Sequence, residues 1–206
     1  SSWTIDGCIN YGTVYSYNSH YAGGIVGQWT NNGGTIAHCY NYGNLQTTWA
    51  TAWVGAAGGI VAQLYHGASG QDFNIISCRN DGSIYGRWGE SASASANDSA
   101  GILGNVTNYI AWNAGKGDGE AFSINVVDCV NGPGVKIYAA SMASGMVGFF
   151  SVDDANRQSS KIGQSTENIV LNIDRCRNYA SLMYGSNFRA GIFGDRYWDK
   201  TSSTTR

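Results

Sequence analysis

The pentapeptide Cys-Ile-Asn-Tyr-Gly at residues 8–12 recurs as Cys-Tyr-Asn-Tyr-Gly at 39–43 and as Cys-Arg-Asn-Asp-Gly at 78–82. Its Cys-x-Asn core continues at 129–131 and 176–178, so all five cysteines of the chain stand in the same motif. Successive cysteines are 31, 39, 51 and 47 residues apart. A motif that returns at such periods predicts a chain built from stacked supersecondary units.

A second motif alternates with the first. Gly-Gly-Ile-Val-Gly at 23–27 has counterparts at 58–62, 100–104, 144–148 and 190–194, and a short apolar segment lies between the two motifs in each unit. Each unit therefore reads as three strand-length segments separated by turn residues, without an amphipathic helical period. We predict one all-β domain over residues 1–206: a single-stranded, right-handed parallel β-helix (solenoid) of about five coils, with long loops on one face.

Equivalent positions of successive coils lie above one another, so the repeated residues should form columns. Five cysteines leave at least one unpaired, and parallel side chains about 4.8 Å apart hold their Cβ atoms beyond disulfide range. We expect a column of buried, reduced thiols beside a ladder of asparagine amides that hydrogen-bond from coil to coil at the turn. The thiol column comprises Cys8, Cys39, Cys78, Cys129 and Cys176, and the amide ladder comprises Asn10, Asn41, Asn80, Asn131 and Asn178.

The segments CINYGTVYSYNSHYAGGIVG and CYNYGNL…AGGIVA resemble the GLUG-type repeats of bacterial surface proteins, including IgA-peptidase-like proteins. They also resemble the coils of lacto-N-biosidase-like β-helix glycosidases. The resemblance covers nearly the whole chain and implies a secreted or cell-wall-attached solenoid, often with many more coils. It carries over no catalytic residue, because no family site matches positions of this sequence.

Composition limits the partners. Only 13% of residues are charged, the formal net charge is -2, and residues 1–78 contain no Lys or Arg, which argues against nucleic acid and anionic membranes as partners. Apolar stretches of about five residues are too short for membrane insertion. No cysteine or histidine pair has metal-ligand spacing, so we expect no metal or cofactor. The chain opens inside a repeat, and we expect an extracellular or cell-surface piece of a longer protein.

Function is expected in the connectors, which lengthen along the chain. From the second glycine of the Gly-Gly motif to the next cysteine, the distance is 15, 19, 28 and then 31 residues. Insertions at one phase of a solenoid emerge on one face, and aromatic rings with few charges suit the stacking of pyranose rings there. We therefore predict a glycan-binding surface. Its candidate residues are Trp29, Tyr65, His66, Tyr109 and Trp112 in these connectors, and Trp49, Trp53 and Trp88 in the other variable connector, between the apolar segment and the glycine-rich motif.

Two alternatives stay open. A catalytic β-helix of a glycoside hydrolase would need two converging carboxylates, one of them with a raised pKa. The candidates are Glu90, Asp98, Asp118, Glu120, Asp153 and Asp154. The other alternative is a structural spacer or a subunit whose bare ends make end-to-end contacts, since open solenoid ends present unpaired strands.

Overall fold

The computed structural model describes residues 3–17, 21–30, 33–48, 55–66, 71–86, 97–108, 122–140, 142–151, 169–185 and 188–194. These residues form strands β1 to β24 and no helix, so the described part of the chain holds no helix able to cross a membrane. All pairings between the named strands are parallel. The prediction of an all-β chain with parallel strands is thereby confirmed.

The strands form five sheets, which we call A to E. Sheet A consists of β1 (Trp3–Asp6), β6 (Gly34–Ala37), β11 (Phe73–Ile76), β16 (Phe122–Val127) and β21 (Ile169–Asp174). Sheet B consists of β2 (Ile9–Asn10), β7 (Tyr40–Asn41), β12 (Arg79–Asn80), β17 (Val130–Asn131) and β22 (Arg177–Asn178). Sheet C consists of β3 (Val14–Tyr17), β8 (Leu45–Thr48), β13 (Ile84–Tyr85), β18 (Lys136–Tyr138) and β23 (Leu182–Tyr184).

The remaining two sheets contain the glycine-rich motif. Sheet D consists of β4 (Tyr21–Gly23), β9 (Gly55–Gly58), β14 (Asn97–Ala100), β19 (Met142–Ser144) and β24 (Phe188–Ala190). Sheet E consists of β5 (Val26–Thr30), β10 (Val61–His66), β15 (Leu103–Asn108) and β20 (Val147–Ser151), and an isolated parallel bridge joins Val147 to Phe193. The chain thus visits sheets A to E in the same order in each of five successive passes, which we number as repeats 1 to 5.

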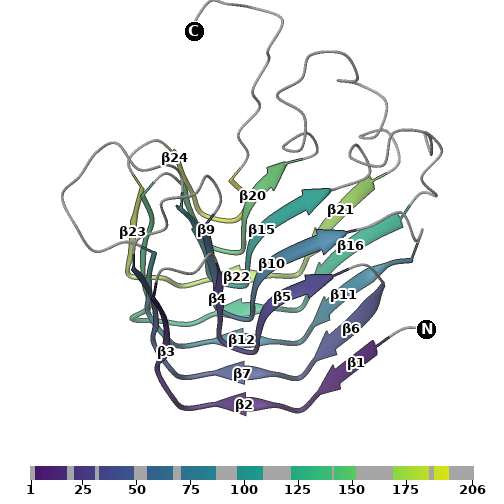
Figure 1. Cartoon of the computed structure of the whole chain (residues 1–206), viewed down its shortest axis with the longest axis horizontal. Helices are drawn as coiled ribbons and strands as arrows, with labels where there is room; N and C mark the ends of the chain where they lie inside the picture. The colour runs from purple at the N-terminus through teal and green to yellow at the C-terminus, as the bar shows by residue number, and fades with distance from the viewer. Residues whose placement is uncertain are drawn as a thin grey trace, which may run out of the picture.

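Strands of successive repeats lie side by side, and in Figure 1 the colours of sheets A to D run from purple through green to yellow, while those of sheet E run from purple to green. Equivalent residues therefore pair in register. Ile5 pairs with Ile36, which in turn pairs with Ile75. Because side chains alternate along a strand, one apolar column of this kind lines the interior while its neighbours face away from it.

Two apolar clusters form the core. The larger contains Ile36, Ile75 and Val126 of sheet A together with Val61 and Leu103 of sheet E. The smaller contains residues of sheets C and D, among them Leu45, Ile84 and Ala57. Apart from Trp29, the residues that repeats 1 and 5 contribute to the two clusters are only partly buried, because each of these repeats has one neighbouring repeat among the described residues.

The turn between sheets D and E requires glycine. A Cβ atom on Gly58 would lie 1.8 Å from the carbonyl oxygen of Val61, closer than real Cβ atoms approach a backbone. A Cβ atom on Gly59 would lie 2.0 Å from the carbonyl oxygen of Gly101 in the next repeat. The Gly-Gly pair therefore permits both the tight turn within a repeat and the close stacking of one repeat on the next.

Candidate functional site

The cysteines stand in one column at the start of sheet B. The backbone N–H of Tyr40 donates to the carbonyl oxygen of Cys8 at 2.8 Å, and the same bond recurs at each later step of the column at 2.9 Å. Cys39, Cys78 and Cys129 are at most 1% exposed, whereas Cys8 is exposed and Cys176 is half-buried. All five are free thiols. Expected burial therefore holds for the three inner thiols and not for Cys8 and Cys176, which belong to the first and the last of the described repeats.

Burial and the hydrogen bonds between thiols decide the chemistry of the inner cysteines, and the hydrogen bond with Cys129 lowers the pKa of Cys78 while the pKa values of Cys39 and Cys129 shift upward. Desolvation raises the pKa of Cys39 to about 11, and its Sγ donates to the carbonyl oxygen of Ala37 at 3.1 Å. The neighbouring thiols of Cys176 and Cys78, together with burial, raise the pKa of Cys129. Because the thiolate is the nucleophilic form, these protonated side chains pack as small apolar groups rather than act as nucleophiles.

The asparagines form a continuous hydrogen-bond ladder. Each Nδ2 donates to the Oδ1 of the next repeat, from Asn10 to Asn41 and from Asn41 to Asn80, both at 2.8 Å. The ladder continues from Asn80 to Asn131 at 2.9 Å and from Asn131 to Asn178 at 2.8 Å. In the first three repeats the same Nδ2 also donates to the carbonyl oxygen two residues later. The ladder therefore has one direction, from repeat 1 towards repeat 5.

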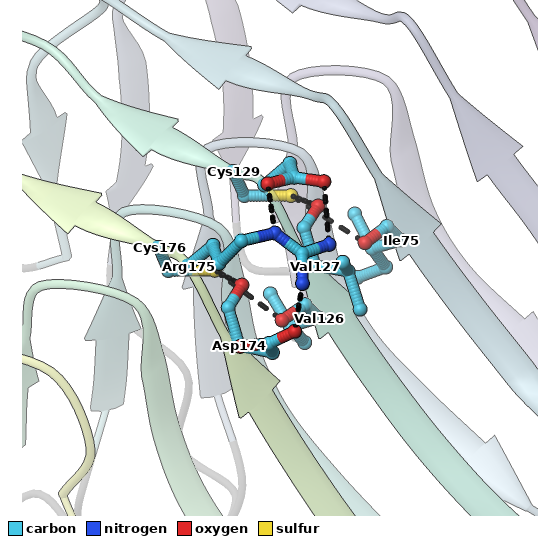
Figure 2. A network of polar contacts seen from close by, with 8 residues as sticks. Ile75, Val126, Val127, Cys129, Asp174, Arg175 and Cys176 are labelled. Carbon is cyan, nitrogen blue, oxygen red and sulfur yellow. Dashed lines mark hydrogen bonds and ion pairs between the residues drawn. The ribbon is translucent and has the colours of Figure 1, made fainter.

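A left-handed corner precedes each cysteine. His38, Ser77, Asp128 and Arg175 have φ between 49° and 54°, and Gly7 takes the same place in repeat 1 with φ 66°. The Arg175 guanidinium donates to both carboxylate oxygens of Asp128 at 2.8 Å and also contacts the Asp174 carboxylate (Figure 2). It lowers the pKa of Asp128. These side chains are about half exposed, so the network adds little stability and holds a corner between repeats.

Two outward columns carry stacked tyrosines. Tyr11 and Tyr42 stack at 5.2 Å between ring centroids with an interplanar angle of 8°. Tyr85 and Tyr138 stack at 5.5 Å and 13°, and Tyr184 follows at 6.3 Å with a tilt of 44°. The rings of Tyr11 and Tyr42, and those of Tyr85 and Tyr138, cover one another's faces. These columns join neighbouring repeats.

Trp29 belongs to the core, contrary to its expected place in a connector. It lies in β5, is 9% exposed, and its ring centroid is 5.2 Å from that of Phe73. A Cβ atom on Gly34 would lie 2.3 Å from the Trp29 ring, so the indole fills the space that this glycine leaves. Strand β5 begins within the glycine-rich motif and extends beyond it to Thr30. Trp29 lies in this extension, and its side chain faces the core.

Asp98 also lies in a strand rather than in a connector. It sits in β14, is 4% exposed, and accepts a hydrogen bond from Nδ2 of Asn105 at 3.3 Å. Asn105 shares its column in sheet E with Gln63 and Gln28, and Nε2 of Gln28 donates to Oε1 of Gln63 at 2.6 Å. Sequence reasoning missed this polar column, which is exposed at Gln28 and buried at Gln63 and Asn105. Its signal is the polar residue that follows the glycine-rich motif at 28, 63 and 105.

The other candidate side chains lie outside the described residues. Tyr65 and His66 belong to β10, but only their backbone is described. The remaining candidates are Trp49, Trp53, Trp88, Glu90, Tyr109, Trp112, Asp118, Glu120, Asp153 and Asp154. Among the described residues, no group of three or more His, Cys, Asp or Glu side chains is placed to hold a metal ion.

The connectors that follow sheet E start from neighbouring positions. Near the ends of the strands, Thr30 pairs with Tyr65, which pairs with Thr107, and Thr107 pairs with Ser151. Each of these strands ends within one residue of that row. The connectors of four successive repeats therefore leave the same edge of sheet E one above the other. Comparison of the chain with protein-family models, with curated proteins and with solved structures finds no match.

Proposed function

We propose that the chain is a right-handed parallel β-helix of five coils from a secreted or cell-surface protein of the GLUG-repeat type, and that it binds glycan through its long connectors. One observation carries the proposal: the strands of sheet E end in register, so four connectors start along one edge. The right hand follows from the strong preference of parallel crossovers. Aromatic residues of successive connectors then stand along one side of a rigid rod.

The tyrosine columns favour this assignment of roles. Their rings stack on one another, so we assign them to the stacking of coils and assign sugar binding to the aromatic residues of the connectors. Trp112 belongs to the connector that follows β15 of sheet E, whereas Trp88 belongs to the connector between β13 of sheet C and β14 of sheet D. A glycan longer than one sugar would contact several coils at once, which suits a surface that recognises polysaccharide chains.

A glycan array probed with the chain tests the proposal, and chromogenic glycosides screened in parallel test for turnover. We expect binding without turnover. The Trp88→Ala, Trp112→Ala double variant should bind about tenfold more weakly or worse, as expected for aromatic anchors. The matched control is Tyr11→Ala, which removes one ring of a tyrosine column and should leave the affinity for glycan unchanged.

Turnover would favour the glycoside hydrolase, with Asp98 the first carboxylate to replace. Silence on the array, or full affinity in the double tryptophan variant, would overturn glycan binding by the connectors.

A further inference from the structure

Asn131 is the one ladder asparagine that is followed by glycine, whereas the others are followed by tyrosine or aspartate. In an unfolded chain, the backbone nitrogen of a glycine readily attacks the side-chain carbonyl carbon of the preceding asparagine, because no Cβ atom hinders the approach. We propose that Asn131 and Gly132 form a spontaneous deamidation site. The site is closed while repeats 3, 4 and 5 are stacked and opens when they separate, so the reaction permanently marks chains that have lost the stack.

The reaction needs only water and conserves every atom. The Gly132 nitrogen forms a bond to Cγ of Asn131, its proton passes to the leaving amide group, and ammonia departs, which leaves a five-membered succinimide ring. Water then opens the ring at either carbonyl carbon. One product has an aspartate at position 131, and the other has an isoaspartate, in which the main chain runs through the former side chain. Both products replace an amide that donates and accepts by a carboxylate that only accepts.

In the stacked chain the side-chain amide of Asn131 is held from both sides. Its Nδ2 donates to Oδ1 of Asn178 at 2.8 Å, and its Oδ1 accepts from Nδ2 of Asn80 at 2.9 Å. The side chain is fully buried, so water is kept from the amide as well. Rotation of the amide towards the following nitrogen would break both bonds and leave buried polar groups unpaired, which is costly.

The attacking nitrogen is also engaged. The N–H of Gly132 donates to the carbonyl oxygen of Asn80 at 2.7 Å, and this bond joins repeat 4 to repeat 3. Attack requires this nitrogen to lose its proton and to turn towards Cγ of Asn131. Both reacting groups are therefore released only when repeat 4 separates from its neighbours, and the reaction rate follows the population of that open state.

The ion pair of repeat 3 explains why glycine stands at this position. The Arg79 guanidinium donates to both carboxylate oxygens of Asp81, at 2.6 and 2.9 Å. A Cβ atom on Gly132 would lie 1.7 Å from Oδ1 of Asp81. The ion pair thus occupies the space that a side chain at position 132 would take. The labile sequence is a consequence of how repeats 3 and 4 fit together.

Deamidated chains cannot rebuild the ladder. A carboxylate at position 131 still accepts from Nδ2 of Asn80, but it offers no donor to Oδ1 of Asn178. It also brings a charge into a fully buried position, where an unpaired charge is strongly unfavourable. The isoaspartate in addition lengthens the main chain by one methylene group, which displaces the Gly132 N–H from the Asn80 carbonyl oxygen.

Peptide mapping by mass spectrometry tests the proposal on the whole chain, held either folded in buffer or unfolded in urea at the same pH and temperature. Deamidation raises the mass of a peptide by about 1 Da. We expect Asn131 to convert in urea and to convert at least about a hundredfold more slowly in the folded chain. Asn125, which is followed by valine, is the internal control and should keep its amide in both samples.

Two sets of variants separate the reaction from its consequence. Gly132→Ala should slow the conversion in urea about tenfold or more, because the added methyl group hinders the attack. Its Cβ atom displaces the Asp81 carboxylate, so Asp81→Ala, Gly132→Ala is a second variant without that contact. Asn131→Asp reproduces one product and should unfold at a lower urea concentration than the unaltered chain. Asn44→Asp is its matched control and should unfold like the unaltered chain, because this exposed side chain accepts from the Ser83 N–H, as a carboxylate also does.

Three outcomes would overturn the proposal. The first is equal conversion of Asn131 in the folded and the unfolded chain, which would mean that stacking does not protect the site. The second is an amide that persists in urea, which would mean that the site does not react. The third is an Asn131→Asp chain as stable as the unaltered one, which would mean that the modification does not prevent stacking. Glycan binding by the folded chain enters none of these measurements, so its success or failure on the array is read independently.

Discussion

Nδ2 of Asn41 donates to Oδ1 of Asn80 at 2.8 Å, and both side chains are fully buried. The bond joins residues 39 positions apart, so it exists only once two repeats have stacked. Pairing between parallel strands of successive repeats joins segments that are far apart in the sequence, so this bond does not form between residues that are close in sequence. The asparagine ladder is therefore a direct report of correct stacking.

Removal of an inner ladder residue should be costly. Asn80→Ala leaves a buried donor on Asn41 and buried acceptors on Asn131 and Gly82 without partners. We expect the free energy of unfolding, measured by urea titration, to fall by about 3 kcal/mol. Asn10→Ala, at the part-exposed end of the ladder, should cost about 1 kcal/mol. Equal losses for the two variants would contradict a role for burial.

Substitution of equivalent glycines in an inner repeat and in repeat 5 should also change stability by different amounts. Gly59→Ala places a Cβ atom 2.0 Å from the Gly101 carbonyl oxygen and 2.4 Å from Cγ of Asn80, whereas Gly191→Ala meets open space. We expect the first to lower the free energy of unfolding by about 3 kcal/mol, because backbone must move, and the second to change it by under about 0.5 kcal/mol. Thermal unfolding of dilute samples measures both. A tolerated Gly59→Ala would mean that repeats stack less closely.

The rate at which each thiol reacts should depend on its position in the cysteine column. Ellman's reagent should modify exposed Cys8 rapidly and half-buried Cys176 more slowly, while Cys39, Cys78 and Cys129 should react only after unfolding. The count of released thionitrobenzoate with and without denaturant measures this division. Cys8→Ser is the control, since it should remove the fast phase alone. A disulfide, or rapid reaction of all five thiols in the native protein, would contradict the buried column.

Alkali should weaken the fold through the buried thiol of Cys39. Burial raises the pKa of Cys39 from its ordinary value of 9.0 to about 11, so the folded state keeps a proton that the unfolded chain releases. The stabilising contribution is complete below pH 9.0 and declines as the pH rises towards about 11. Urea titrations across this range should show the decline, and Cys39→Ala should reduce its slope. An unchanged slope would assign the effect to other groups.

Glycine at the left-handed corner should stabilise the chain. Ser77 has φ 52°, a conformation that costs a residue with a side chain about 1 kcal/mol or more and that glycine adopts freely. Ser77→Gly should therefore raise the free energy of unfolding by about 0.5 to 1 kcal/mol, after allowance for the greater freedom of the unfolded chain. Gly7→Ser, at the equivalent corner of repeat 1, should have the opposite sign in the same assay. Two changes of the same sign would show that the corner does not decide the effect.

The sequence by itself determined the elements that every repeat must have. A cysteine two residues before an asparagine, and a glycine pair before an apolar pair, recur because the backbone at each corner imposes the same demand in each repeat. These requirements of the backbone conformation involve residues that are adjacent in sequence, so a short motif reveals them. From them follow the all-β class, the parallel stacking and the places where the chain turns.

Only the tertiary structure decided which side chains lie inside. Trp29 and Asp98 stand in segments whose sequence differs between repeats, yet Trp29 packs against Phe73 and Asp98 is buried beside Asn105. Strand register also decided that Tyr11 stacks on Tyr42 and that Cys8, in the first repeat, is exposed while Cys39 is buried. The physical reason is that burial depends on what the next repeat places alongside, and a motif contains no information about its neighbour across 30 to 50 residues.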